Sequence, residues 1–368
     1  MKFLPYLAVY LSATCALADD TIHQQVTLKG KWLVETNDKV MLDPQTSALK
    51  LWRGKLLSLS DRSAHESQQK QLHIIDPSDA VVEEKSLEMT ISDEIKESCF
   101  YPYLADKPDF EALAIDPSND NVFIIVTEDA RDGIQLTAAC QKRFQNTGST
   151  KYPSLIVRLE MDKNNVLSMT HVRPLQFAAS YAVGDFANDG IEGLAFGKDN
   201  TLYLGLEKDS KDLARIFSLP LSDKFWESDE FAPVVDTNVV LPVFEKGVHP
   251  INGMDYISVD NHPGYIAAAA RNDNQLWIID LANKKPTKVI SMKFLAPVIS
   301  NDNQCKDWEL IGNSSLEGVA VANNNIWLIN DPWKAHYTEN VKCESNRHKY
   351  ESFSPLLFSL PISKQWFE

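Results

Sequence analysis

The sequence predicts an all-β fold, a single β-propeller, and two observations lead to this prediction. A short phrase recurs along the chain, as FEALAID at Phe110–Asp116, IEGLAFG at Ile191–Gly197 and LEGVAVA at Leu316–Ala322, with altered copies from Ser47 and from Asn252. Each copy is followed by turn residues and then by a second apolar run. Self-similarity at a regular spacing is typical of a radial array of small sheets around a central channel.

Further apolar runs supply the other predicted strands. The second strand of each unit is expected at Asn121–Thr127, Thr201–Leu206, Tyr265–Ala270 and Asn325–Ile329. A third strand recurs at Gln71–Asp76, Leu155–Met161, Arg215–Leu221, Gln275–Asp280 and Leu356–Ile362. These counts favour five blades of four antiparallel strands, with Val26–Glu35 closing the ring against the C-terminal sheet. The long interval from Glu111 to Glu192 and the weakly patterned Ile91–Asp109 are also compatible with six blades.

The N-terminus has the pattern of a secretory signal peptide. Lys2 precedes the apolar stretch Phe3–Leu11, and Ala16-Leu17-Ala18 forms a cleavage site of the A-x-A kind. We therefore expect residues 1–18 to be removed and residues 19–368 to form one propeller domain, secreted or periplasmic. No other segment has the roughly 20 consecutive apolar residues of a membrane span.

The charge of the chain excludes one class of partner. With 36 Lys and Arg against 51 Asp and Glu, the net charge is −15. Such a surface repels nucleic acid, because nucleic-acid binding depends on clustered basic side chains. An acidic channel instead attracts calcium at extracellular concentrations. We expect a monomer that binds a small anionic substrate or ligand.

Cysteine usage agrees with an oxidising compartment. Beyond the signal peptide the chain has four cysteines, Cys99, Cys140, Cys305 and Cys343, which allow three pairings. Cys99 and Cys140 bracket the second copy of the phrase, and Cys305 and Cys343 bracket the fifth. The positions therefore favour the pairs Cys99–Cys140 and Cys305–Cys343.

One position of the phrase carries a side-chain oxygen in all five copies: it directly follows the first apolar residue in the three close copies and opens the two altered ones. We call these five the ring residues: Ser47, Glu111, Glu192, Asn252 and Glu317. Each is followed by Ala or Gly, which lets backbones approach closely near the channel. Equivalent positions of different blades converge, so these side chains are predicted to bind a hard cation. Oxygen donors without His or Cys favour calcium over zinc or copper.

A second polar position ends the next strand of each unit. The residues there are Asp61-Arg62, Glu128-Asp129, Glu207-Lys208, Arg271-Asn272, and Asp331 with Lys334. They are predicted at the same end of the channel as the ring residues. From this set, Asp61, Arg62, Lys208 and Lys334 are the predicted catalytic residues, because a cation with nearby basic groups stabilises charge on an anionic substrate.

Short motifs resemble known families. LLSLSDR, EALAID, DGIEGLAF and LEGVAV resemble the secreted phytase-like, "esterase-like activity of phytase" group of β-propellers. The ring also resembles that of calcium-activated nucleotidases of the apyrase type, which are five-bladed propellers with axial calcium and ligands in the order Ser, Glu, Glu, Ser, Glu. Ser47, Glu111, Glu192, Glu317 and the Asp61-Arg62 pair match that pattern, whereas Asn252 departs from it.

A third resemblance concerns INGMD around Asn252. It is similar to the Asn-Gly signature of calcium-dependent lactonases of the gluconolactonase and paraoxonase type. Those enzymes carry an Asp ligand on another blade, and this sequence has no clear counterpart.

The residues and these resemblances leave three hypotheses. The leading hypothesis is a calcium-dependent hydrolase of a phosphoester or related anionic ester. The alternatives are a non-catalytic, calcium-stabilised scaffold that binds a ligand or protein, and a calcium-dependent lactonase.

Overall fold

The computed structural model describes residues 24–128, 135–144, 152–183, 190–222, 224–298 and 305–368. The predicted signal peptide, residues 1–18, lies outside the described residues. The fold is mostly β. Among the residues described, no helix combines the length and the apolar character needed to cross a membrane.

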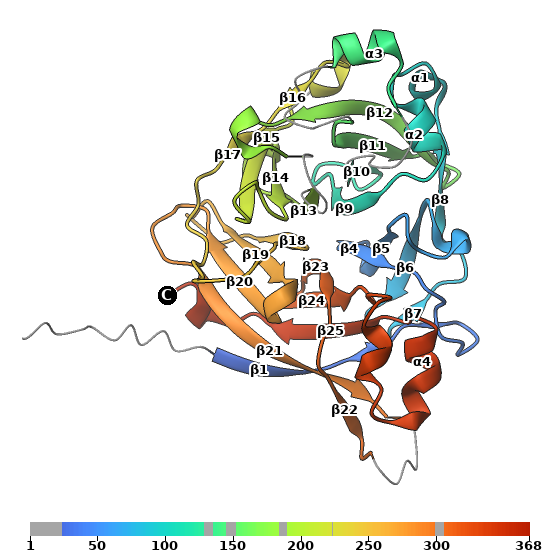
Figure 1. Cartoon of the computed structure of the whole chain (residues 1–368), viewed down its shortest axis with the longest axis vertical. Coiled ribbons are helices and arrows are strands. Elements are labelled where there is room, and N and C mark those ends of the chain that lie inside the picture. Colours follow the sequence, from blue (N-terminus) through green and yellow to red (C-terminus); the bar gives the residue numbers. More distant parts are fainter. Residues whose placement is uncertain (1–23, 129–134, 145–151, 184–189, 223, 299–304) are drawn as a thin grey trace, which may run out of the picture.

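The recurring phrases form the innermost strands, which gather at the middle of the molecule (Figure 1). These strands are β4 (Thr46–Trp52), β9 (Phe110–Ile115), β13 (Ile191–Phe196), β18 (Met254–Ile257) and β23 (Leu316–Ala322). β4 packs beside β9, β9 beside β13, β13 beside β18, β18 beside β23, and β23 beside β4. Strands from distant parts of the sequence therefore bring the openings of the phrases together.

Each inner strand pairs antiparallel with a second strand, and the second strand pairs with a third. The second strands are β5 (Lys55–Ser60), β10 (Val122–Thr127), β14 (Thr201–Leu206), β19 (Tyr265–Ala270) and β24 (Asn325–Asn330). The third strands are β6 (Gln71–Asp76), β11 (Leu155–Met161), β15 (Arg215–Pro220), β20 (Gln275–Asp280) and β25 (Leu356–Pro361). The predicted second and third strands therefore exist, within one or two residues of their predicted bounds.

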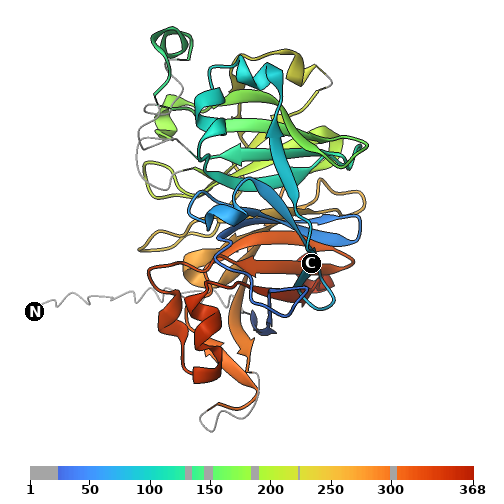
Figure 2. The same cartoon turned by 90° about the vertical axis from the view of Figure 1, so that its right-hand side faces the viewer.

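The outer strands depart from independent four-stranded blades. They are β7 (Val81–Val82), β8 (Leu87–Ile91), β12 (Leu167–Gln176), β16 (Ala232–Pro233), β17 (Val235–Asp236), β21 (Lys288–Pro297) and β22 (Trp308–Ile311). β8 pairs with β6 and also, in parallel, with β12, and so joins two units into one 11-stranded sheet. The remaining sheets have six, four and four strands. In the side view, β4 and β5, in blue, lie between the green strands β11 and β12 and the red strands β24 and β25 (Figure 2).

The N-terminal segment crosses three units. β2 (Lys31–Trp32) pairs antiparallel with β25, which agrees with the expected closure of Val26–Glu35 against the C-terminal sheet. β1 (Gln24–Lys29) instead runs parallel to β21, and β3 (Val34–Glu35) runs parallel to β7. Segment 24–35 therefore connects three units of the fold, where the prediction gave it one partner.

The described helices are few and short. They are α1 (Asp93–Lys96), α2 (Tyr101–Ala105), α3 (Ala138–Arg143) and α4 (Arg347–Glu351). Single 3-10 turns occur at Glu66–Gln68, Ala179–Tyr181, Lys198–Asn200, Phe225–Glu227, Arg271–Asp273, Tyr337–Asn340, Glu344–Asn346 and Lys364–Trp366. α1 and α3 begin at hydroxyl caps, since Ser92 and Thr137 accept hydrogen bonds from backbone N–H groups of their first turns.

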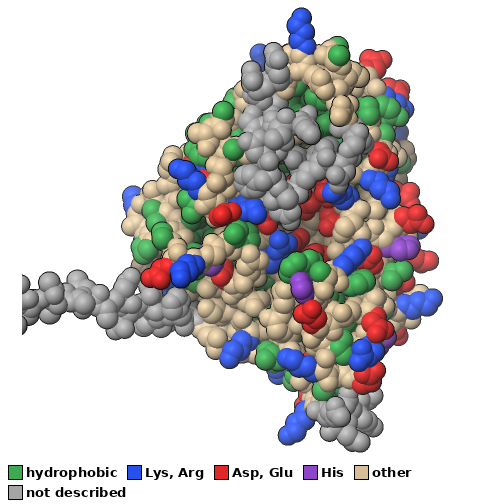
Figure 3. Space-filling model, in the orientation of Figure 1, with side chains coloured by type: hydrophobic (Ala, Val, Ile, Leu, Met, Phe, Trp, Pro, Cys, Tyr) green, Lys and Arg blue, Asp and Glu red, His purple; other side chains and the backbone are tan. Residues whose placement is uncertain are grey.

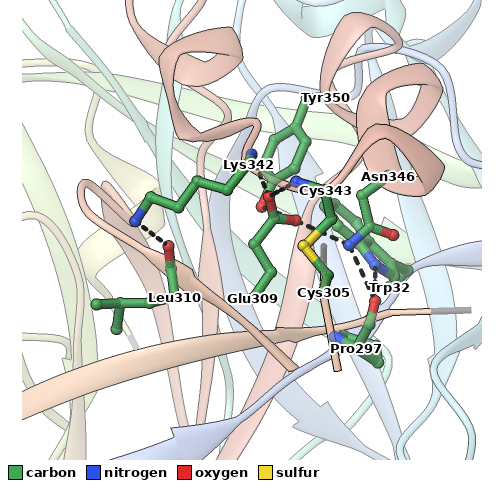
Figure 4. The surroundings of a disulfide bond; sticks show 9 residues. All are labelled: Trp32, Pro297, Cys305, Glu309, Leu310, Lys342, Cys343, Asn346 and Tyr350. Atoms are coloured by element: carbon green, nitrogen blue, oxygen red, sulfur yellow. Dashed lines mark hydrogen bonds between the residues drawn. A yellow bond between two sulfur atoms is a disulfide. The ribbon is translucent and has the colours of Figure 1, made fainter. Parts of the chain in front are cut away.

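Two disulfides confirm the predicted cysteine pairing. Cys99 is bonded to Cys140 and Cys305 to Cys343. Beside the second disulfide, the buried Glu309 carboxylate accepts hydrogen bonds from Cys343 N at 2.7 Å and from Asn346 Nδ2 at 2.9 Å (Figure 4). Tyr350 OH donates to the same carboxylate at 3.2 Å. The disulfide and this carboxylate together hold the helical segment 337–351 against β22.

Apolar side chains fill the spaces between neighbouring sheets. Leu49 and Leu56 of one sheet share a buried cluster with Ala320 and Ile329 of another. Burial of such faces is the main stabilising contribution, at about 25 cal/mol per Å² of apolar surface. The core is therefore distributed between sheets, as in propeller-type folds.

Candidate functional site

Four of the ring residues occupy β-bulges. Between β4 and β5, Thr46 faces Ser60 and Ala48 faces Leu59, so that Ser47 is the extra residue. The pairings of β9, β13 and β23 skip one residue in the same way, and the skipped residues are Glu111, Glu192 and Glu317. A bulge re-aims the side chain of its extra residue. The repeated bulge therefore explains how side chains on separate strands turn toward a common point.

The three ring glutamates meet. One carboxylate oxygen from each of Glu111, Glu192 and Glu317 lies within 4.8 Å of the other two, and all three residues are buried. Calcium ligands lie roughly 2.3–2.6 Å from the ion, so ligands on opposite sides are about 5 Å apart. The spacing of these carboxylates fits a shared hard cation.

The other two ring residues carry neutral oxygens. Ser47 Oγ donates to Phe110 O at 2.7 Å, which leaves the hydroxyl oxygen with lone pairs to offer. Asn252 is fully buried, and neither its Oδ1 nor its Nδ2 has a hydrogen-bond partner among the described residues. An unpartnered buried amide costs about 1–3 kcal/mol, and a ligand would offset this cost. The all-oxygen donor set and the orphaned amide fit calcium.

The strand-end residues form a second layer. Asp61, Glu128, Glu207 and Asp331 each follow a second strand and donate their backbone N–H to the residue two before the ring residue of the same unit. The acceptors are Gln45 O at 3.0 Å, Asp109 O at 3.0 Å, Gly190 O at 2.9 Å and Ser315 O at 2.7 Å. Glu128, Glu192 and Glu207 make a further group of carboxylates within 4.8 Å of one another, as do Asp109, Glu111 and Glu128. The acidic cluster is therefore larger than the ring.

Arg271 is the basic member of this layer. Its guanidinium donates to Glu317 Oε1 and, at 3.2 Å, to Glu207 Oε1. The nearby carboxylates raise the pKa of Arg271 despite its burial. Arg271 thereby neutralises part of the cluster and ties a ring glutamate to a strand-end glutamate.

The remaining acids crowd one another. Burial raises the pKa of Glu111, and the carboxylate of Glu192 raises it further. Burial also raises the pKa of Glu192, with the carboxylate of Glu207 adding to the effect. The pKa of Glu317 rises to about 7 because of burial, although Arg271 opposes the shift. Neighbouring buried carboxylates repel one another, and either protonation or a bound cation relieves this repulsion.

These groups line one cavity of about 490 Å³. Its walls include ring residues Glu111, Glu192 and Glu317, strand-end residues Asp61, Glu128, Arg271 and Asp331, and Gln45, Ser63, Asn272, Asn274, Gly312, Asn313 and Trp333. Figure 3 shows acidic and basic side chains side by side around the middle of this face. Asn340, from the disulfide-held segment 337–351, accepts a hydrogen bond from Gly312 N at 2.9 Å and so fixes one wall.

Of the four predicted catalytic residues, one lines the cavity. Asp61 lines the cavity, and burial together with the Asp109 carboxylate raises its pKa to about 7. Arg62 points to Asp109, with Nε 2.9 Å from Oδ2. Lys334 pairs with Asp43 at 2.8 Å, and neither Lys334 nor Arg62 nor Lys208 lines the cavity.

Of the first strand-end pair, both members were predicted at the cavity, and Asp61 is the one that lines it. Neighbours on an extended chain point in opposite directions. The cavity is accordingly lined by Asp61 where Arg62 was also expected, and Glu207 joins the buried acids where Lys208 was expected. Glu128, Arg271 and Asp331 were visible as strand-end residues, but nothing in their sequence ranked them above their neighbours.

Comparisons with known proteins find distant similarities of fold only. No family model matches the sequence, and no curated protein matches it, so the resemblance to phytase-like propellers stays a prediction. Solved structures similar in fold include the PQQ-bound aldose sugar dehydrogenase from Streptomyces coelicolor, at 12% identity and a TM-score of 0.39 over 89% of this chain and 96% of that one. The Malassezia sympodialis allergen Mala s 1 has 8% identity and a TM-score of 0.44 over 87% of this chain and 95% of that one. These neighbours have propeller-type folds, and at such similarity they assign neither ligand nor reaction.

Proposed function

We propose that this chain is a secreted, cation-dependent ester hydrolase whose reaction takes place in the 490 Å³ cavity, on a single propeller of five blades. The supporting observation is the convergence of the buried Glu111, Glu192 and Glu317 carboxylates. Ser47 and Asn252 complete the proposed ligand set, and calcium is the proposed cation. When bound, a divalent cation supplies Lewis-acid polarisation of an ester oxygen.

Asp61 is the proposed general base. It lines the cavity, and Ser63 N and Ala64 N donate to its Oδ1 and fix its orientation. A carboxyl with a pKa of about 7 accepts a proton from water more readily than an ordinary carboxylate does. Arg271, held by Glu207 and Glu317, is placed to stabilise negative charge that develops in the cavity.

The charge of the cavity bears on the substrate. Among the described residues that line it, Arg271 is the sole basic one, and it already contacts two carboxylates. A divalent cation would offset two carboxylates and leave Asp61, Glu128 and Asp331 in excess. Electrostatics thus favours a neutral ester such as a lactone, and the exposed Trp333 offers a surface on which a ring could stack.

The anionic ester remains the second candidate. One observation favours it: Arg271 donates a hydrogen bond to Glu317. Cation binding by Glu317 would compete with this hydrogen bond. A released guanidinium would then be available for a phosphoester. In this case Lys208, Lys334 and Arg62 would assist from outside the cavity lining.

Hydrolysis assays with a panel of lactones and phosphoesters test the proposal. Glu192→Gln is the test variant and Glu88→Gln, on the exposed face of β8, is the matched control. Chelation of calcium and Glu192→Gln should each lower turnover by about 100-fold, the scale seen for loss of one electrostatic group in an active site. A turnover rate that changes neither with chelation nor with Glu192→Gln would contradict the proposed hydrolase function. Calcium-dependent melting without turnover of any substrate would instead support the non-catalytic scaffold.

A further inference from the structure

A buried lysine, Lys50, lies beside two of the ring glutamates. It lies on β4, three residues beyond Ser47, and its side chain is 8% exposed. A void of about 10 Å³, the volume of about one water, lies next to it. Lys50 lines this void together with Glu192 and Glu317.

Oxygen atoms from two other inner strands surround the Lys50 ammonium. Nζ donates to Met254 O at 2.6 Å and to Val319 O at 3.2 Å, and it lies 3.1 Å from Asp255 Oδ1. An ammonium group has three hydrogens to donate, so these three acceptors satisfy it. Lys50 on β4 therefore binds β18 and β23 across the middle of the fold.

Asp255 is itself held in place. Its Oδ2 accepts a hydrogen bond from Val321 N at 2.7 Å, while Oδ1 faces Lys50. Two backbone carbonyls and a fixed carboxylate are the oxygen groups that surround a bound cation in proteins. Desolvation lowers the pKa of Lys50, and Asp255 opposes this by favouring the charged form.

We propose that the Lys50 ammonium fills a second cation position in the channel, and that this position accepts a free ammonium or potassium ion when the side chain is removed. The tethered cation makes this end of the channel independent of dissolved ions. It also blocks passage from the acidic cavity through the middle of the fold. The proposal does not depend on calcium binding by the ring residues.

Chemical rescue of Lys50→Ala tests this assignment. Melting of the full chain is followed in equal concentrations of ammonium chloride and tetramethylammonium chloride, because the second cation is too large for the space vacated. The variant should melt below the wild type, and ammonium should raise its Tm by about 3 °C or more relative to tetramethylammonium. Lys55→Ala, which removes a half-exposed partner of Asp76, is the matched control and should show no such difference.

Two outcomes would overturn the proposal: Lys50→Ala melting like the wild type, or equal effects of the two salts on its Tm. A second comparison applies even if Lys50→Ala does not fold. Lys50→Met leaves the partly buried Asp255 without its cationic partner, so Lys50→Met/Asp255→Asn should melt above Lys50→Met. A double variant that is no more stable than Lys50→Met would also contradict the proposed cation position.

Discussion

At the scale of single residues, the site is defined by buried carboxyl groups that outnumber the positively charged groups beside them. Glu111, Glu192 and Glu317 meet within 4.8 Å, and Arg271 contacts one of them. Burial raises the pKa of each of these three glutamates. The calcium-free protein must therefore retain protons that an unfolded chain would release, which ties its stability to pH.

The sign of this dependence follows from Asp61. Its pKa is about 7 in the folded chain, against an ordinary value of about 4. Its contribution to stability is fully present below about pH 4 and is lost as the pH rises through about 7. In chelator, the free energy of unfolding of the wild type should fall by about 1–3 kcal/mol relative to Asp61→Asn between pH 5 and pH 8. Urea titrations at both pH values measure this difference, and a constant or rising difference would refute the assignment.

The three ring glutamates meet as predicted, whereas Arg62, Lys208 and Lys334 are not among the residues that line the cavity. Glu111, Glu192 and Glu317 were recognisable because the same phrase surrounds each of them. Lys208 and Lys334 were chosen for their charge, whereas their direction depends on strand alternation and on partners such as Asp43. Lys50 was overlooked because its oxygen partners are backbone carbonyls of distant strands.

At the scale of elements, the bulges and the glycines beside them set how closely the inner strands approach. These bulges could not be predicted, because a one-residue mismatch with a partner strand leaves no mark in the phrase itself. A Cβ added to Gly253 would lie 2.0 Å from Glu317 O, a backbone atom of the next inner strand. A Cβ added to Gly193 would lie 2.7 Å from Met254 Cγ, which belongs to a flexible side chain.

The two glycines therefore predict different costs. Gly253→Ala requires the backbone near Glu317 to shift, and it should destabilise the protein by about 3 kcal/mol or more. Gly193→Ala should cost about 1 kcal/mol, because the Met254 side chain can move. Chemical denaturation of both variants measures the difference. Equal effects, or a larger loss for Gly193→Ala, would show that the approach of β18 to β23 is not limited by Gly253.

At the scale of the whole molecule, segment 24–35 links three units through β1, β2 and β3. Its pairing with the C-terminal sheet was predicted from the sequence. The extra pairings with β21 and β7 were not, since short strands of two residues carry little pattern. Trp32 anchors the segment: it packs edge-on against Tyr350 and donates to Pro297 O at 3.2 Å.

Loss of this anchor should weaken the entire fold. Trp32→Ala should cost about 3–5 kcal/mol, because a large buried side chain leaves a cavity. Hydrogen exchange should then show loss of protection in β7, β21 and β25 together. Val243→Ala, at a side chain that is 95% exposed, is the control and should change stability little. Loss confined to β25 would contradict a linking role for the segment.

The central claim is that the ring residues bind a divalent cation, and calorimetric titration of the chelator-treated protein with calcium tests it most directly. We predict saturable binding with a Kd between about 1 μM and 1 mM, weakened at least about tenfold by Glu192→Gln and unchanged by Glu88→Gln. Absence of saturable binding, or equal affinity in the wild type and Glu192→Gln, would contradict the account.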